Sequence, residues 1–110
     1  MVFQQGDIIA VSFDPSLGHE PQKRRPGVVV SSDDFNMKSS MTFVAPITTT
    51  KSNYPLHVVI TEETDDIYGS VCVEQTRAMD LAARPSERVG RLCESDMAEV
   101  LTCLGAIFDL

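Results

Sequence analysis

The residues SDMAEVLTCLGAIFDL (95–110) decide the fold that this sequence predicts. Apolar side chains recur there at the spacing of one helical face, at Met97, Val100, Leu101, Leu104, Ile107 and Phe108. We therefore expect an amphipathic helix that packs on the rest of the chain. Ser95 is its expected N-cap, and Asp96 and Glu99 place negative charge in the first turn, where the helix dipole favours it.

Ahead of this helix, the chain consists of short runs of β-branched and aromatic residues separated by turn signals. The runs predict strands at 7–13, 27–32, 41–48, 56–61, 70–74 and 88–93, with a polar turn or short helix at 33–40 that begins at Ser32 or Asp33. Pro46 interrupts the third run and indicates a bulge or a sheet edge, because proline cannot donate to a strand ladder. Five or six short strands closed by one helix favour a mainly β fold, either a small barrel or a strongly curved sheet.

Length and composition allow one domain, spanning residues 1–110. The chain has 110 residues, of which 43% are hydrophobic and 23% charged, an ordinary globular composition. Its net charge of −7 is uneven: residues 1–61 carry five basic and five acidic side chains, and residues 62–110 carry four and eleven. An acidic chain is a poor candidate for sequence-independent binding to long nucleic acid, which depends on phosphate contacts.

Neither a metal site nor a membrane segment is expected. The three cysteines form no CxxC pair, and the two histidines are not spaced with them as a metal set, so reduced thiols are predicted. No apolar run approaches the roughly 18 residues of a membrane helix, and the first residues lack a signal pattern. A cytoplasmic protein is therefore expected.

Residues 14–26, DPSLGHEPQKRRP, form a long polar loop for so small a domain, which favours a functional role. Arg25 closes this loop directly before Pro26, which restricts its backbone to extended conformations. A guanidinium held at a strand start suits a phosphate or a carboxylate, and a salt bridge to an acidic neighbour is the alternative. His19 and Glu20 in the same loop are capable of acid–base chemistry or simply form a solvated turn.

Two strand ends carry further candidates. Thr48 ends the third predicted strand, where its hydroxyl can donate to a phosphate oxygen or serve only the strand. Glu74, Gln75 and Arg77 follow the fifth strand, where they can read base edges or form a hydrogen-bond network. Asn36 either caps the 33–40 turn or faces a ligand.

Several segments together resemble the MazF/PemK (Kid) toxins of bacterial toxin–antitoxin modules. The matching segments occur in family order over nearly the whole chain: GDIIAVSFDPSLGHE (6–20), RRPGVVVS (24–31), the asparagine of DDFN (36), FVAPITT (43–49), YPLHVVI (54–60), GSVCVEQTRAMDLAAR (69–84) and the final helix. The resemblance implies an SH3-like (CcdB/PemK-type) barrel of short antiparallel strands, a homodimer, and neutralisation by a MazE/PemI-like antitoxin.

It also implies a metal-independent, cofactor-free endoribonuclease that cuts single-stranded mRNA at a short sequence. The family's catalytic arginine and threonine correspond to Arg25 and Thr48. The implied reaction is attack of the ribose 2′-hydroxyl on its own phosphate, which leaves a 2′,3′-cyclic phosphate and a 5′-hydroxyl. His19 and Glu20 join the implied catalytic set. The residues expected to contact RNA are Lys23, Arg24, Ser31, Asn36, Thr49, Glu74, Gln75, Arg77 and Arg84.

The chain mixes features of two branches of this family. One branch has an arginine and an aspartate where this chain has Cys72 and Glu74, and it keeps the loop histidine. Another has glutamate–glutamine at 74–75. The general base is therefore open among Glu20, His19 and Glu74. Two other functions stay open: a CcdB-like gyrase poison that acts through its C-terminal helix, and a catalytically weak binding module on the same fold.

Overall fold

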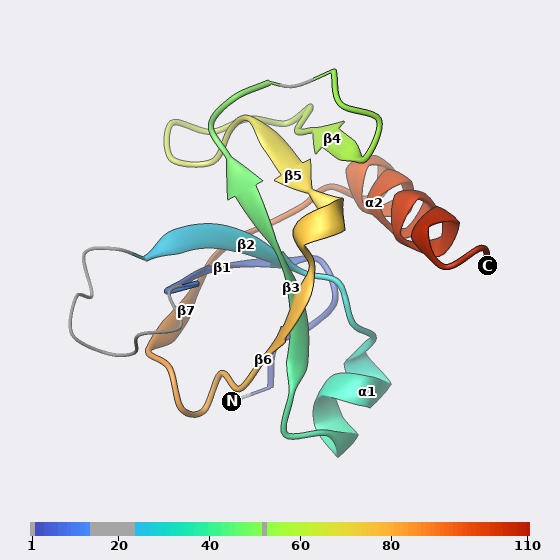
Figure 1. Cartoon of the computed structure of the whole chain (residues 1–110). Coiled ribbons are helices and arrows are strands. Elements are labelled where there is room, and N and C mark those ends of the chain that lie inside the picture. Colours follow the sequence, from blue (N-terminus) through green and yellow to red (C-terminus); the bar gives the residue numbers. More distant parts are fainter. Residues whose placement is uncertain (1, 14–23, 52) are drawn as a thin grey trace.

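The computed structural model describes residues 2–13, 24–51 and 53–110 (Figure 1). In chain order the elements are β1 (Asp7–Val11), β2 (Arg25–Val29), α1 (Asp33–Lys38), β3 (Thr42–Thr48), β4 (His57–Val59), β5 (Ser70–Cys72), the 3-10 turn η2 (Val73–Gln75), β6 (Arg77–Met79), β7 (Ser86–Arg91) and α2 (Glu94–Ile107). The strands form one sheet in the order β4-β5-β3-β2-β1-β7, with β6 also paired to β3, and every pairing is antiparallel. The predicted mainly β fold with a C-terminal helix is confirmed.

Both faces of the sheet are buried at β2, which explains why Val28, Val29 and Val30 form an unbroken apolar run. Val28 and Val30 pack with Ile8 and residues of α2 in one core, whereas Val29 packs with Ile9 and others in a second core. A strand exposes alternate side chains on opposite faces, so a strand between two cores reads as continuously hydrophobic.

Pro46 lies in a central strand, and the interruption that it signals is in the neighbouring strand. On one side of β3, Pro46 pairs with Gly27 of β2. On the other side, β6 pairs as far as Val44 and β5 begins at Ile47, and η2 connects the two strands between these points. The residue without an N–H thus falls where β3 has no ladder partner on that side. The predicted sheet edge at Pro46 is wrong, because β3 lies inside the sheet and the interruption falls between its partner strands β5 and β6.

Helix α2 differs from the prediction at its N-terminus. The N-cap is Cys93 rather than Ser95, and its side chain makes no capping hydrogen bond. Asp96 is 2% exposed and accepts hydrogen bonds from the backbone N–H and hydroxyl of Thr61, which fixes the helix to the segment after β4. A buried partner 35 residues away is invisible to a local capping pattern.

The apolar face of α2 is only partly covered. Met97 and Val100 are buried, whereas Ile107 and Phe108 are exposed at the end of the helix. Figure 1 shows this end projecting beside η2, away from β7. No helix in the described part of the chain has the length and apolar character needed to cross a membrane.

Local boundaries follow the prediction within a few residues. Ser32 caps α1 by accepting from the backbone N–H of Phe35 at 3.1 Å, as predicted. β2 begins at Arg25 instead of 27, and β7 spans Ser86–Arg91 instead of 88–93. The segment after β5 bends at η2 before β6 begins.

Candidate functional site

The antiparallel register of β2 and β3 brings Arg25 and Thr48 together. Gly27 pairs with Pro46, and continuing that register by two residues sets Arg25 opposite Thr48. Side chains opposite each other on neighbouring strands have Cβ atoms about 5 Å apart. Both residues line one open cavity of about 240 Å³, together with Pro46, Ile47, Thr50, His57, Cys72 and Gln75. Four strands and η2 thus contribute to one site.

Arg25 is exposed at the start of its strand. Among the described carboxylates, none forms an ion pair with its guanidinium. The salt bridge considered as the alternative is therefore absent among these groups. A planar fork of N–H donors faces the cavity without a described anion to neutralise it, which suits an incoming phosphate.

Thr48 is held by the tight approach of a glycine. Gly69 has φ +106°, a conformation that side chains other than glycine rarely adopt, and a Cβ built there would collide with the carbonyl oxygen of Thr48. The next residue, Ser70, pairs with Thr48 across the β3–β5 ladder. The backbone N–H of Thr50 lies 3.5 Å from the Thr48 hydroxyl oxygen. The backbone of Thr48 is therefore fixed from two sides.

Cys72 lies in the wall of the cavity. It is buried, and this burial, followed by the charge of Glu74, raises the pKa of its thiol above the ordinary value of 9.0. A backbone hydrogen bond from Thr48 and the charge of Arg25 act in the opposite direction and are outweighed. Cys72 is therefore a neutral thiol at pH 7 and adds no positive charge to the site.

His57 and Glu74 form a bonded pair beside the cavity. The imidazole Nε2 lies 3.0 Å from Glu74 Oε2, and the amide of Gln75 donates to the same oxygen at 3.4 Å. Burial acts to raise the pKa of the Glu74 carboxyl, but hydrogen bonds from His57, from the backbone and from Gln75, with the charge of His57, lower it overall. Glu74 is thus held ionised. The imidazole is packed edge-on against the Tyr54 ring, with 5.0 Å between centroids.

Several residues expected to contact RNA lie away from this cavity. Asn36 is buried, and its amide donates to the carbonyls of Phe3 and Ser31 while its oxygen accepts from the Ser31 hydroxyl. The Ser31 oxygen also accepts from the backbone N–H of Phe43. These groups hold α1 against the sheet, and the structure does not bring them to Arg25. Asn36 is not the helix cap either, since Ser32 fills that role.

The other residues expected to contact RNA lie in different places, some next to the cavity and some bonded elsewhere in the fold. The guanidinium of Arg77 stacks over the Phe13 ring at 5.1 Å, and Arg84 donates to the carbonyl of Ser12 at 2.8 Å. Arg24 and Thr49 directly adjoin Arg25 and Thr48, and Thr49 is exposed. His19, Glu20 and Lys23 lie outside the described residues.

Sequence reasoning missed His57 as a site residue. Its run, LHVVI, predicted only a strand, and nothing local distinguishes a histidine that faces a cavity from one in a sheet. The signal that could have found it is that its predicted strand, 56–61, directly precedes along the chain the predicted strand that ends in Glu74. In the structure, His57 pairs with Cys72, two residues before Glu74.

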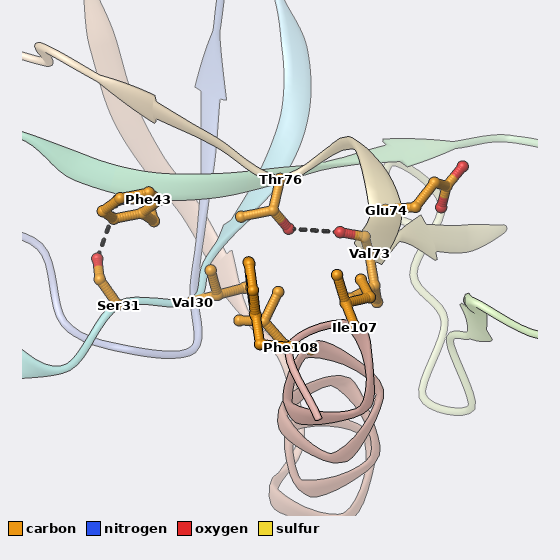
Figure 2. Close-up of a pocket in the computed structure, with 9 residues that line it drawn as sticks. Val30, Ser31, Phe43, Val73, Glu74, Thr76, Ile107 and Phe108 are labelled. Carbon is orange, nitrogen blue, oxygen red and sulfur yellow. Dashed lines mark hydrogen bonds between the residues drawn. The ribbon is translucent and has the colours of Figure 1, made fainter. Parts of the chain in front are cut away.

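A second, larger hollow of about 360 Å³ lies beside the end of α2 and is mostly apolar (Figure 2). In Figure 2, Ile107 and Phe108 at the helix end border it on one side, and Phe43 lies on the far side. The Thr76 hydroxyl donates to the Val73 carbonyl at 2.7 Å on its floor, so this polar group is satisfied. The other lining residues are Ser31, Val73, Glu74 and Leu104.

Almost the whole chain is similar to a known protein family. Positions 4–108 match the family described as PemK-like, MazF-like toxin of type II toxin–antitoxin system. The chain is 40% identical to the endoribonuclease toxin ChpB of Escherichia coli K12, covering 97% of this chain and 95% of that protein. It is 33% identical to the endoribonuclease PemK of Escherichia coli, covering 94% and 80%.

Solved structures agree with the fold. MazF of Deinococcus radiodurans superposes with a TM-score of 0.84 at 26% identity, covering 100% of this chain and 99% of that one. A MazE–MazF complex from the same organism gives a TM-score of 0.84 at 24% identity, with the same coverage. This second similarity concerns the fold alone.

Proposed function

This chain belongs to the PemK-like, MazF-like family of endoribonuclease toxins, and from that premise we propose that it cuts single-stranded RNA by internal attack of a ribose 2′-hydroxyl. The products are a 2′,3′-cyclic phosphate and a 5′-hydroxyl end. Arg25 and Thr48 are the residues that act on the phosphate. We further propose that cutting occurs at a short sequence motif, in the cytoplasm, and without a metal ion.

One observation carries this proposal: Arg25 at the start of β2 and Thr48 at the end of β3 line the same cavity. In the attack, negative charge grows on the non-bridging phosphate oxygens, so donors fixed at those oxygens stabilise the transition state. The Arg25 guanidinium supplies two parallel N–H groups, and the Thr48 hydroxyl supplies a third donor. The nucleophile is already tethered next to its phosphate, so the chain has only to orient it.

The net charge of −7 argues for a short RNA footprint. Phosphate contacts dominate affinity for nucleic acid, and the acidic residues concentrate after position 61. Arg25 places positive charge at the cavity instead, and Arg24 directly precedes it in the chain. Binding through a few phosphates predicts a shallow dependence of affinity on salt.

We propose two protein partners. The first is a second copy of this chain, with RNA lying near the two-fold axis between loops 14–25 and 49–55. The second is a cognate antitoxin of the MazE/PemI kind, which is supported by the match to toxins of type II toxin–antitoxin systems. A chain that cuts RNA as a stable monomer at micromolar concentration would contradict the first partner.

A gyrase poison is the second candidate function, because Ile107, Phe108 and Leu110 are exposed at the end of the chain. Such a poison acts by binding protein through this end and does not require Arg25. Substitution of Arg25 therefore distinguishes the two functions, because RNA cutting requires this residue and gyrase poisoning does not.

The test is to incubate the purified protein with a long single-stranded RNA in EDTA and map the product ends. We expect cuts at a shared short motif with 5′-hydroxyl ends, lost in Arg25→Ala and weakened in Thr48→Val. Lys38→Ala, on the exposed outer side of α1, is the matched control and should cut normally. A folded, antitoxin-free protein that cuts nothing but inhibits DNA supercoiling would overturn the proposal.

A further inference from the structure

We propose that His57 accepts the proton of the attacking 2′-hydroxyl, with Glu74 orienting its imidazole. This inference rests on the proposed RNA cleavage and identifies the proton acceptor that Arg25 and Thr48 do not supply. An arginine stays protonated in proteins, and a threonine hydroxyl is a poor base. Attack by a 2′-hydroxyl nevertheless requires a group that removes its proton.

The first support is position. His57 lines the same cavity as Arg25 and Thr48, because β4 lies next to β5 and β5 pairs with the end of β3. Among the described histidines and carboxylates, it is the one that lines this cavity. The Glu74 carboxylate instead borders the apolar hollow and reaches the cavity wall through its hydrogen bond to the imidazole.

The second support is the hydrogen-bonding state of the two ring nitrogens. Glu74 is ionised and accepts at Oε2, so the Nε2 nitrogen of His57 carries the proton of that bond. In the neutral form of the ring, which is the form that can take up a proton, the lone pair then lies on Nδ1. This nitrogen is buried and has no hydrogen-bond partner in the described part of the chain. A buried acceptor without a donor is costly, and an entering hydroxyl would satisfy it.

Nδ1 is shielded from solvent in the chain without RNA, and the whole side chain is 14% exposed. The proposal therefore requires a small shift of the ring when RNA binds. Catalytic hydrogen bonds often form only in the substrate complex. The charged and titratable groups around the ring include Glu74 on η2, Cys72 on the paired strand, Tyr54 before β4 and Arg25 in the cavity.

The step balances without a further reactant. The 2′-O–H bond breaks, its proton goes to His57 Nδ1, the 2′-oxygen bonds to phosphorus, and the bond from phosphorus to the 5′-oxygen breaks. The departing 5′-oxygen takes a proton from water, and His57 returns its own to water. Nothing is oxidised or reduced, and Glu74 stabilises the imidazolium that forms in between.

The test compares three variants on a short RNA that contains the mapped cleavage motif, under single-turnover conditions across pH. His57→Gln keeps an amide able to donate to Glu74 but cannot take a proton. We expect it to cut about 100-fold more slowly or worse, and to lose the rise of rate with pH that the wild type shows. Added imidazole should partly restore cutting to His57→Ala. Glu74→Gln should fall between these variants and the wild type.

Two results would overturn the inference. Cutting by His57→Gln within threefold of the wild type, with the same pH profile, would show that no proton passes through the ring. A slow His57→Gln that keeps the rise with pH, with no rescue of His57→Ala by imidazole, would show a structural role. Thermal melts establish that each variant is folded. If the wild type itself does not cut, the proposed function fails rather than this inference.

Discussion

The polar cavity at Arg25 and Thr48 and the apolar hollow beside α2 differ in the chemistry of the side chains that line them. The smaller one collects a guanidinium, hydroxyls, an amide and an imidazole from four strands and η2. The larger one is bordered mainly by valine, leucine, isoleucine and phenylalanine side chains beside the end of α2. Size alone would favour the larger, yet chemistry on a phosphate needs fixed donors aimed at one point. Convergence of polar groups therefore identifies the site, and volume does not.

Glu74 links the two hollows. Its side chain borders the apolar one, and its carboxylate bonds to the imidazole that lines the polar one. The two regions are separated by little more than η2, a turn that exists because β5 and β6 pair with different parts of β3. Substitutions confined to one hollow test whether the two regions act separately.

The largest effect is expected from Arg25→Lys in the polar cavity. Lysine keeps the charge but lacks the planar fork, so it cannot bind two phosphate oxygens in parallel. Cutting should slow by about 100-fold while the melting temperature stays unchanged, since Arg25 is exposed. Single-turnover cleavage and a thermal melt measure both quantities. Normal cutting would mean that charge alone suffices and that the cavity geometry is not what selects the phosphate.

Gly69→Ala should damage both stability and activity, because its Cβ collides with the backbone of Thr48. We expect a loss of about 1–3 kcal/mol in the free energy of unfolding, typical of a residue forced into a strained backbone conformation. Cutting should fall as well, since Thr48 must shift. Urea unfolding gives the first quantity and cleavage of the motif RNA the second. Gly105→Ala, where the nearest neighbours leave ordinary contact space, is the matched control.

Glu74→Gln tests the link between the two regions through pH. The carboxyl pKa is lowered in the folded chain, so its ionised form contributes stability above the unfolded value. That contribution disappears as pH falls below about 4.5, the ordinary value of the group. The variant lacks this group and should lose less stability than the wild type between pH 5 and pH 3. Melting temperatures across that range measure the difference, and parallel curves would contradict it.

The smallest effect is expected from Phe108→Ser at the apolar hollow. Its side chain is 67% exposed, so folding stability should change by less than about 0.5 kcal/mol. RNA cutting should be unchanged, because Phe108 is not among the residues that line the polar cavity. Urea unfolding and the motif cleavage assay measure both. A large loss of cutting would mean that the two hollows act as one site.

The sequence was sufficient for the order and type of the elements apart from β6 and η2, and less so for the contacts between them. The stripe from Met97 to Phe108 predicted α2 because it is a local pattern, and turn residues separated the strands. The Thr61–Asp96 and His57–Glu74 hydrogen bonds join residues far apart in sequence. The break opposite Pro46 likewise depends on where β5 and β6 pair with β3. Such contacts depend on register, which one local segment does not determine.

The candidate site was predicted in the same uneven way. Arg25 and Thr48 stood at strand ends with suitable chemistry, and the resemblance to the toxin family raised both above their structural alternatives. Asn36 looked equally suitable as a polar residue in a turn, yet its amide is used inside the fold. Burial decides between these cases, and a single sequence does not record it.

The central claim is that Arg25 and Thr48 act on one phosphate as a unit, and a double-mutant cycle tests it most directly. Single-turnover cleavage in EDTA is measured for the wild type, Arg25→Ala, Thr48→Val and the double variant. We predict that the double variant is about as slow as Arg25→Ala alone, because residues that act together lose their effects non-additively. Full additivity of the two losses, or cutting that survives Arg25→Ala, would contradict the account.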